Sequence, residues 1–110
     1  MESKDIIETS FNIIFEAGEA RVSCENALTA LEEFDYEKAD SEMAAAHKKI
    51  VEAHRIHTEI IQQNMESMES QPYYMIFAHA QDTLMTINSE IVLAKHLLKM
   101  FKALDEKIKK

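Results

Sequence analysis

The chemistry open to this sequence depends mainly on its histidines, of which there are five: His47, His54, His57, His79 and His96. On a helix, His79, Asp82 and Thr86 stand at i, i+3 and i+7 and therefore share one face. A neutral imidazole is a competent nucleophile near neutral pH because its ordinary pKa is about 6.5. Attack on phosphorus needs little beyond positioning and charge stabilisation. The spacing therefore indicates either a nucleophilic His79, oriented by Asp82, or a polar patch without chemistry.

Metal binding and other nucleophiles have less support. Helical zinc sites use His-Glu-x-x-His and di-iron bundles use Glu-x-x-His, and the sequence contains neither pattern. His54 and His57 stand at i and i+3 without a carboxylate at helical spacing, which favours a packed His57 and a surface His54. Cys24 falls in an apolar stripe, where cysteine behaves as a small hydrophobe. A single glycine cannot form a loop that cradles a nucleotide phosphate.

The charge of the chain disfavours several classes of partner. There are 20 acidic and 12 basic residues, for a net charge of −8. Nucleic acids and anionic membrane surfaces both require a basic face. The acidic start is not a secretory signal, and the longest run without Asp, Glu, Lys or Arg (residues 70–81) is too short to span a membrane. With one cysteine, these features predict a cytoplasmic protein without direct membrane insertion.

The elements that position these residues are predicted to be helices. The chain has one Gly and one Pro, and residues that favour helices dominate its composition. Apolar periodicity predicts helices over about 4–33, 36–66 and 73–107, with Asp35 as the N-cap of the second and a break over residues 65–72. Such helices with short connections form one all-α domain over residues 1–110, an antiparallel three-helix bundle.

The apolar stripes are wider than a bundle of this size needs. A second stripe of Ile7, Phe11, Ile14 and Gly18 accompanies the main stripe of the first helix. We expect the excess to form a self-association face; the alternative is an exposed apolar surface, which small soluble monomers avoid. Gly18 costs about 1 kcal/mol relative to Ala inside a helix. Close approach of a neighbouring helix is its expected role, and a tolerated defect is the alternative.

Four segments resemble the lactose/cellobiose-specific IIA family of the bacterial phosphoenolpyruvate-dependent sugar phosphotransferase system. The resemblance extends over nearly the whole chain, in the family's order and without an insertion. The four segments are residues 11–21 (FNIIFEAGEAR), 35–39 (DYEKA), 53–62 (AHRIHTEIIQ) and 79–86 (HAQDTLMT). The last segment is similar to the family's active-site motif and is the most specific of the four.

This resemblance implies a homotrimer of three-helix bundles, a nine-helix bundle, with the active histidines near subunit boundaries. His79 would accept a phosphoryl group from HPr, itself charged from phosphoenolpyruvate by enzyme I, and pass it to a cysteine of the IIB component. The membrane component IIC would then transport a disaccharide and deliver it for phosphorylation. Asp82 would help to bind one Mg²⁺ on the three-fold axis, where three carboxylates and waters can supply an octahedral oxygen shell. Gln81 belongs to the motif without an assigned role.

Two residues depart from the family's pattern. Many members have a second histidine directly after the aspartate, and here Thr83 could assist only through its hydroxyl. Phe34 stands where the family commonly has a glycine, which we expect to alter the turn and not the chemistry. Thr83 also favours the alternative function, a non-catalytic trimeric interaction or regulatory module of the same fold. The sugar is left open among lactose, cellobiose and chitobiose-type disaccharides, because selectivity belongs mostly to the membrane component.

Overall fold

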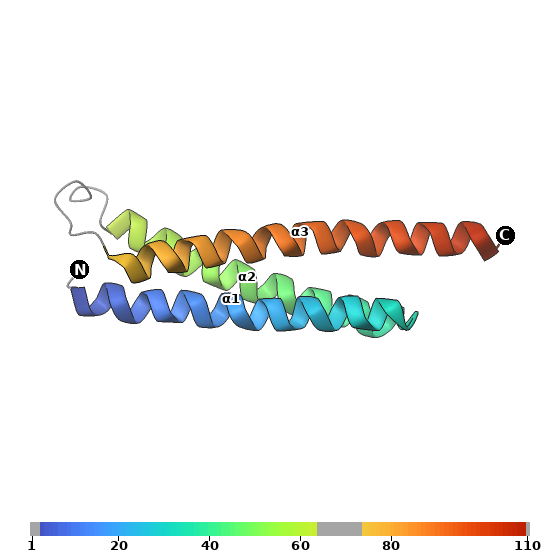
Figure 1. Ribbon diagram of the computed structural model, residues 1–110, viewed down its shortest axis with the longest axis horizontal. Coiled ribbons are helices and arrows are strands. Elements are labelled where there is room, and N and C mark those ends of the chain that lie inside the picture. The colour runs from blue at the N-terminus through green and yellow to red at the C-terminus, as the bar shows by residue number, and fades with distance from the viewer. Residues whose placement is uncertain (1–2, 64–73, 110) are drawn as a thin grey trace.

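The computed structural model describes residues 3–63 and 74–109, which form three long helices (Figure 1). They are α1 (Ser3–Glu32), α2 (Tyr36–Gln63) and α3 (Met75–Lys109). The all-α three-helix class predicted from the sequence is confirmed. The expected end of the second helix at 66, the break over 65–72 and the start of the third near Pro72 lie outside the described residues. At its other end, α3 continues past the expected 107.

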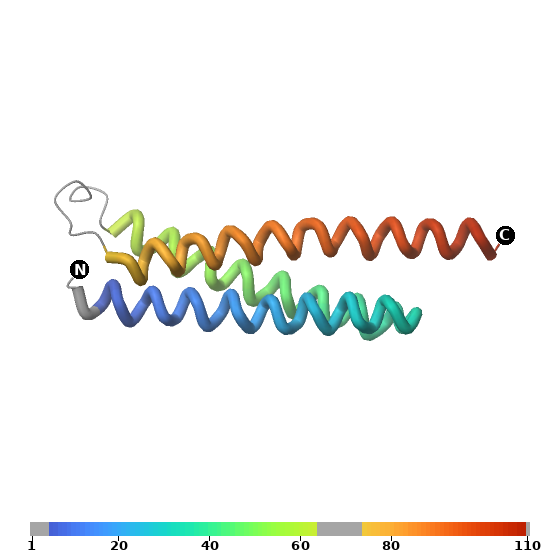
Figure 2. The backbone as a smooth tube through the Cα atoms, in the orientation of Figure 1, coloured from blue at the N-terminus to red at the C-terminus, as the bar shows by residue number. Residues whose placement is uncertain are grey.

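The bundle is a thin rod, 62 Å long and 18 by 17 Å across. Figure 2 shows that the starts of α1 and α3 lie at one end of the rod and the C-terminal end of α3 at the other. Helix α2 runs in the opposite direction to α1 and α3. In Figure 1, α3 extends beyond the turn that joins α1 to α2. Because each helix has only two neighbours, a large part of every helix surface is left uncovered.

The core occupies one face of each helix, and its members recur at spacings of mainly three and four residues. In α2 these are Ala39, Met43, Ala46, Ile50, Ala53, His57 and Ile60. In α3 they are Ala80, Leu84, Ile87, Ile91, Ala94 and Leu98. In α1, Cys24 is buried as predicted, among mostly alanine and isoleucine side chains. Of the three helix pairs, α1 and α2 pack most extensively, and α2 and α3 make the least contact.

The turn between α1 and α2 has the hydrogen bonds of a Schellman motif. The Asp35 N–H donates to the carbonyl of Ala30 at 2.9 Å, and the Phe34 N–H to the carbonyl of Leu31 at 3.0 Å. Phe34 has a φ of 61°, so it adopts the left-handed conformation that a glycine would favour. The predicted N-cap is confirmed, because the Lys38 N–H donates to Oδ1 of Asp35 at 3.1 Å.

An aromatic cluster holds α3 against this turn. The ring of Phe101 lies 5.4 Å from that of Phe34 and 6.3 Å from that of Tyr36, measured between centroids. The Tyr36 hydroxyl donates to Oδ2 of Asp105 at 2.5 Å, which raises the pKa of Tyr36 to about 12. The same hydrogen bond, followed by one from Lys109, lowers the pKa of Asp105. The far end of α3 is therefore tied to the start of α2.

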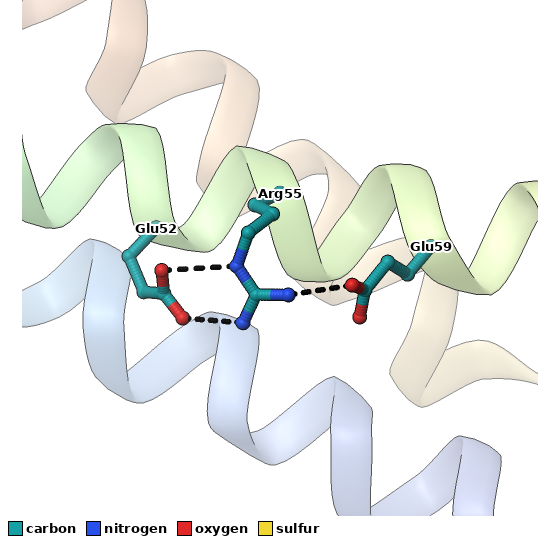
Figure 3. Close-up of polar contacts among 3 residues, drawn as sticks. All are labelled: Glu52, Arg55 and Glu59. Atoms are coloured by element: carbon teal, nitrogen blue, oxygen red, sulfur yellow. Dashed lines mark hydrogen bonds and ion pairs between the residues drawn. The ribbon is translucent and has the colours of Figure 1, made fainter.

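The exposed side of α2 carries an ion-pair ladder within a single helix (Figure 3). Arg55 lies between Glu52, which it contacts through Nε and Nη2 at 3.1 and 2.5 Å, and Glu59, which it contacts through Nη1 at 2.6 Å. The hydrogen bond to Glu52 is the main reason that the pKa of Arg55 is raised and that of Glu52 lowered. Ladders of this kind support the exposed face of a helix and add little to global stability.

The expectation that Gly18 allows a neighbouring helix to approach closely is wrong within this chain. Among the described residues, no atom outside its chain neighbours and its own helical backbone lies within 4 Å of the position that a Cβ would occupy there. The residue therefore does not mark a close approach of α2 or α3. It lies on the same side of α1 as the exposed residues Phe11 and Val22, and is itself half-buried.

Candidate functional site

His79 lies in the second turn of α3, and its side chain is exposed. Within the described ranges 3–63 and 74–109, its ring has no hydrogen-bond or ion-pair partner. Among these described residues, His79 thus lacks a hydrogen-bond partner on another helix of the kind that His57 has in Gln81. An exposed and unpaired imidazole can meet an atom brought by another protein.

Asp82 and Thr86 are exposed on the same face of α3, one and two turns after His79. The sequence raised the possibility that Asp82 orients the His79 ring, but these two side chains form no hydrogen bond in the part of the chain that is described. Farther along α3 the same face becomes apolar, with exposed side chains at the same alternating spacing: Leu93, Leu97, Met100 and Leu104. His79 and Asp82 therefore form the polar end of a long apolar stripe.

A second exposed apolar stripe runs beside it on α1, formed by Ile7, Phe11, Phe15 and Val22. Arg21 pairs with Glu90 at 2.9 and 3.1 Å, which sets the register of α1 against α3. A groove of about 300 Å³ follows this junction and includes Leu28, Leu93 and Leu97 among its lining residues. We call the two stripes together the α1–α3 face. The width expected of the apolar surface on the first and third helices is thus present, and no other part of the described chain covers it.

Gln81 points the other way, toward α2. Its Oε1 lies 2.7 Å from Nε2 of His57, whose side chain is only 6% exposed. The His57 ring also stacks on Phe77, with centroids 5.7 Å apart and an interplanar angle of 5°. The prediction of a packed His57 is confirmed, whereas His54 is half-buried, with its ring 6.5 Å from that of His57. No sequence pattern pairs His57 with Gln81; the i, i+4 spacing of Phe77 and Gln81 is the one local signal that both share a face.

Thr83 is half-buried, between the core residue Leu84 and the exposed Asp82 along α3. Its hydroxyl forms no hydrogen bond with the described residues. In this structure it therefore does not connect His79 to any other polar group.

Metal binding by side chains of the described residues of one chain alone has no support. They contain no group of three or more His, Cys, Asp or Glu side chains close enough to hold one. Asp82 contributes one exposed carboxylate, and magnesium requires six oxygen ligands, of which waters can supply several. Any site built on Asp82 therefore needs the same residue from further copies of the chain, an arrangement that its place on an exposed stripe permits. Separately, no described helix is long and apolar enough to cross a membrane.

Comparison with known proteins gives a consistent result. The family model for "PTS system, Lactose/Cellobiose specific IIA subunit" matches residues 8–102. The lactose-specific EIIA component of Lacticaseibacillus casei is 33% identical over 94% of this chain and 91% of its own. The cellobiose-specific enzyme IIA of Bacillus anthracis superposes with a TM-score of 0.83 at 30% identity, covering 97% of this chain and 95% of its own. The Escherichia coli IIA(chitobiose) protein, solved in complex with HPr, gives 0.79 at 24% identity over 96% of this chain and 99% of its own, a likeness of fold.

Proposed function

Because this chain belongs to the lactose/cellobiose-specific IIA family of the phosphotransferase system, we propose that it is a phosphocarrier that works through His79. His79 accepts a phosphoryl group from HPr and passes it to the IIB component, for uptake and phosphorylation of a disaccharide by way of IIC. The observation that carries the proposal is the exposed ring of His79, which has no hydrogen-bond or ion-pair partner among the described residues and lies in the segment that resembles the family's active-site motif. The protein is then a phosphotransferase component that acts only with partner proteins.

The chemistry needs only groups that the site holds or that the partners bring. The lone pair of one neutral ring nitrogen of His79 attacks phosphorus, and a P–N bond forms as the bond from phosphorus to the donor breaks. The other ring nitrogen keeps its proton, and nothing is oxidised or reduced. Transfer to the IIB cysteine repeats the exchange with sulfur as the attacking atom. Since the donor and the acceptor must use the same nitrogen in turn, an exposed ring suits the task better than an enclosed one.

The start of α3 favours the charge that His79 would carry once phosphorylated. Helical side chains lean toward the N-terminus of their helix, so a phosphoryl group on His79 lies over the first turn of α3. There the helix dipole stabilises negative charge, and the first N–H groups have no partners of their own within the helix. The N–H groups of Phe77 and Ala78, in this first turn, donate to the carbonyl of Tyr74.

We further propose that the chain is a homotrimer that binds one Mg²⁺ between three copies of Asp82. The α1–α3 face supports self-association, because its exposed Leu93 and Phe11 would otherwise stay in contact with water. Three symmetry-related carboxylates would repel one another, and a divalent cation with bound waters removes that repulsion. Asp82 then serves assembly, while His79 serves transfer. Exchange between proteins of this kind, and a single buried cysteine, fit a cytoplasmic location.

The decisive experiment is phosphorylation by enzyme I, HPr and phosphoenolpyruvate, followed by intact-mass measurement. The wild type is expected to gain one acid-labile phosphoryl group per chain, and His79→Gln none. The matched control is His96→Gln, because His96 is also an exposed histidine of α3. A label that persists in His79→Gln refutes the assignment of the acceptor. A trimeric wild type that takes no label at all supports the alternative function, a non-catalytic interaction or regulatory module, which Thr83 favours.

A further inference from the structure

Four polar side-chain pairs join α2 to α3 among the described residues, and they are unevenly placed along α3. Three lie toward the C-terminal half of α3: Lys95 with His47 at 2.8 Å, Lys102 with Asp40 at 2.6 Å, and Asp105 with Tyr36 at 2.5 Å. Of these four described pairs, the one near His79 is His57 with Gln81. From this distribution we infer that His57 is a positioning residue, which holds the turn of α3 that carries His79 in the place that phosphoryl transfer requires. The inference rests on the proposed function.

His57 contacts α3 through both a hydrogen bond and a ring stack. Its Nε2–H donates to Oε1 of Gln81, and its ring face covers Phe77 in a parallel stack. Both contacts are shielded, since the side chain is 6% exposed. A buried donor deprived of its acceptor is energetically costly, so rotation of Gln81 away from α2 is resisted. The pairing therefore fixes the rotation of α3 about its own axis as well as its distance from α2.

This constraint reaches His79 through the helix itself. Phe77 and Gln81 stand two residues before and two residues after His79, on the side of the helix that faces α2. His79 stands on the exposed side of the same turns. Because α2 and α3 make the least contact of the three helix pairs, the contacts of His57 matter for the place of these turns against α2, while the buried Ala80 and Leu84 hold the same turns to the core. A displacement of about 1 Å at a reacting group can cost roughly a hundredfold in rate.

The test measures single-turnover transfer from phosphorylated HPr at saturating concentration in four proteins: wild type, His57→Phe, His57→Gln and Tyr36→Phe. His57→Phe keeps an aromatic face for Phe77 but cannot donate to Gln81, and its rate is expected to fall about tenfold or more. His57→Gln keeps a donor within reach of Gln81, and we expect it to restore most of the rate. Tyr36→Phe removes a hydrogen bond between the same two helices at the other end of the rod. We therefore expect it to lower the stability of the protein and to leave the rate of phosphoryl transfer unchanged.

A second readout separates this inference from the proposed function. Amide hydrogen exchange over residues 75–82 is expected to rise in His57→Phe, while Tyr36→Phe raises exchange only near the C-terminal end of α3. If the wild type takes no phosphoryl group, the proposed function fails and the exchange pattern still decides whether His57 holds this turn. If the wild type is labelled but His57→Phe matches its rate, or Tyr36→Phe is equally slow, the positioning role is wrong. Should His57→Phe not fold, Gln81→Met breaks the same bond and must reproduce its predicted effects.

Discussion

Asp82 follows His79 by one helical turn on the same exposed face of α3, yet no hydrogen bond joins these two side chains in the described chain. The i, i+3 spacing is compatible with two roles for Asp82, orientation of the His79 ring and metal binding, and the structure bears on which of them is open to it. A carboxylate that oriented the imidazole would lie against the ring. One that served a symmetric metal site would point outward, as an exposed Asp82 can.

Removal of magnesium is therefore expected to act through Asp82. In the wild type, a chelator should lower the melting temperature and weaken the trimer, because three carboxylates are left to repel one another. Asp82→Asn keeps the size of the side chain and removes its charge, so its melting temperature should not respond to the chelator. Thermal unfolding with parallel light scattering measures both effects. A wild type indifferent to chelator and to the substitution would return Asp82 to the role of an orienting partner for His79.

Self-association is expected to depend on one side of α3 only. Leu97 belongs to the α1–α3 face and is 43% exposed, while Val92 is 48% exposed and lies off that face on the same helix. Leu97→Glu places a charge in the proposed interface and should shift the protein toward monomers. Val92→Glu is the matched control and should leave the mass unchanged in sedimentation or light scattering. Equal behaviour of the two variants would argue against the α1–α3 face as the interface.

At Phe34, a glycine variant is expected to be more stable than an alanine variant, which is the reverse of the order inside a helix. At a φ of 61°, alanine keeps the strain of a left-handed residue and glycine relieves it, while both lose the contact with Phe101. Phe34→Gly should therefore be more stable than Phe34→Ala by about 1 kcal/mol. At the exposed helical position Ser41, the same comparison should favour alanine by a similar amount, about 1 kcal/mol. Denaturant unfolding of the four variants gives both differences.

The bond between Tyr36 and Asp105 predicts a defined dependence of stability on pH. The pKa of Tyr36 is raised from 10 to about 12, so its contribution is complete below pH 10 and is lost as pH rises toward 12. The pKa of Asp105 is lowered from 3.8, so its contribution is complete above that value and is lost as pH falls below it. The difference in unfolding free energy between wild type and Tyr36→Phe should thus narrow at both extremes. A difference that stays constant from pH 7 to 12 would mean that the hydrogen bond does not form in solution.

Much of the fold could be predicted because helix formation is governed by neighbours three and four residues apart. The buried residues of α2 follow the alternating spacing that the sequence displays, and Asp35 caps that helix as expected. The same local rule failed at Gly18, since a glycine within a helix does not reveal whether another helix passes close to it. The conformation of Phe34 could not be predicted either, because nothing in the type of its side chain indicates a left-handed backbone.

For the candidate site, the sequence by itself determined which residues share a face: His79 with Asp82, and Phe77 with Gln81. That much follows from the helical repeat, which is a property of residues close together in the chain. Only the tertiary structure decided what each face meets. It turned Gln81 toward His57, 24 positions away, and left His79 exposed, because the placement of α3 against α1 and α2 depends on the packing of three helices together. A periodic pattern defines the sides of a helix, but burial of the largest apolar surface selects the side that faces inward.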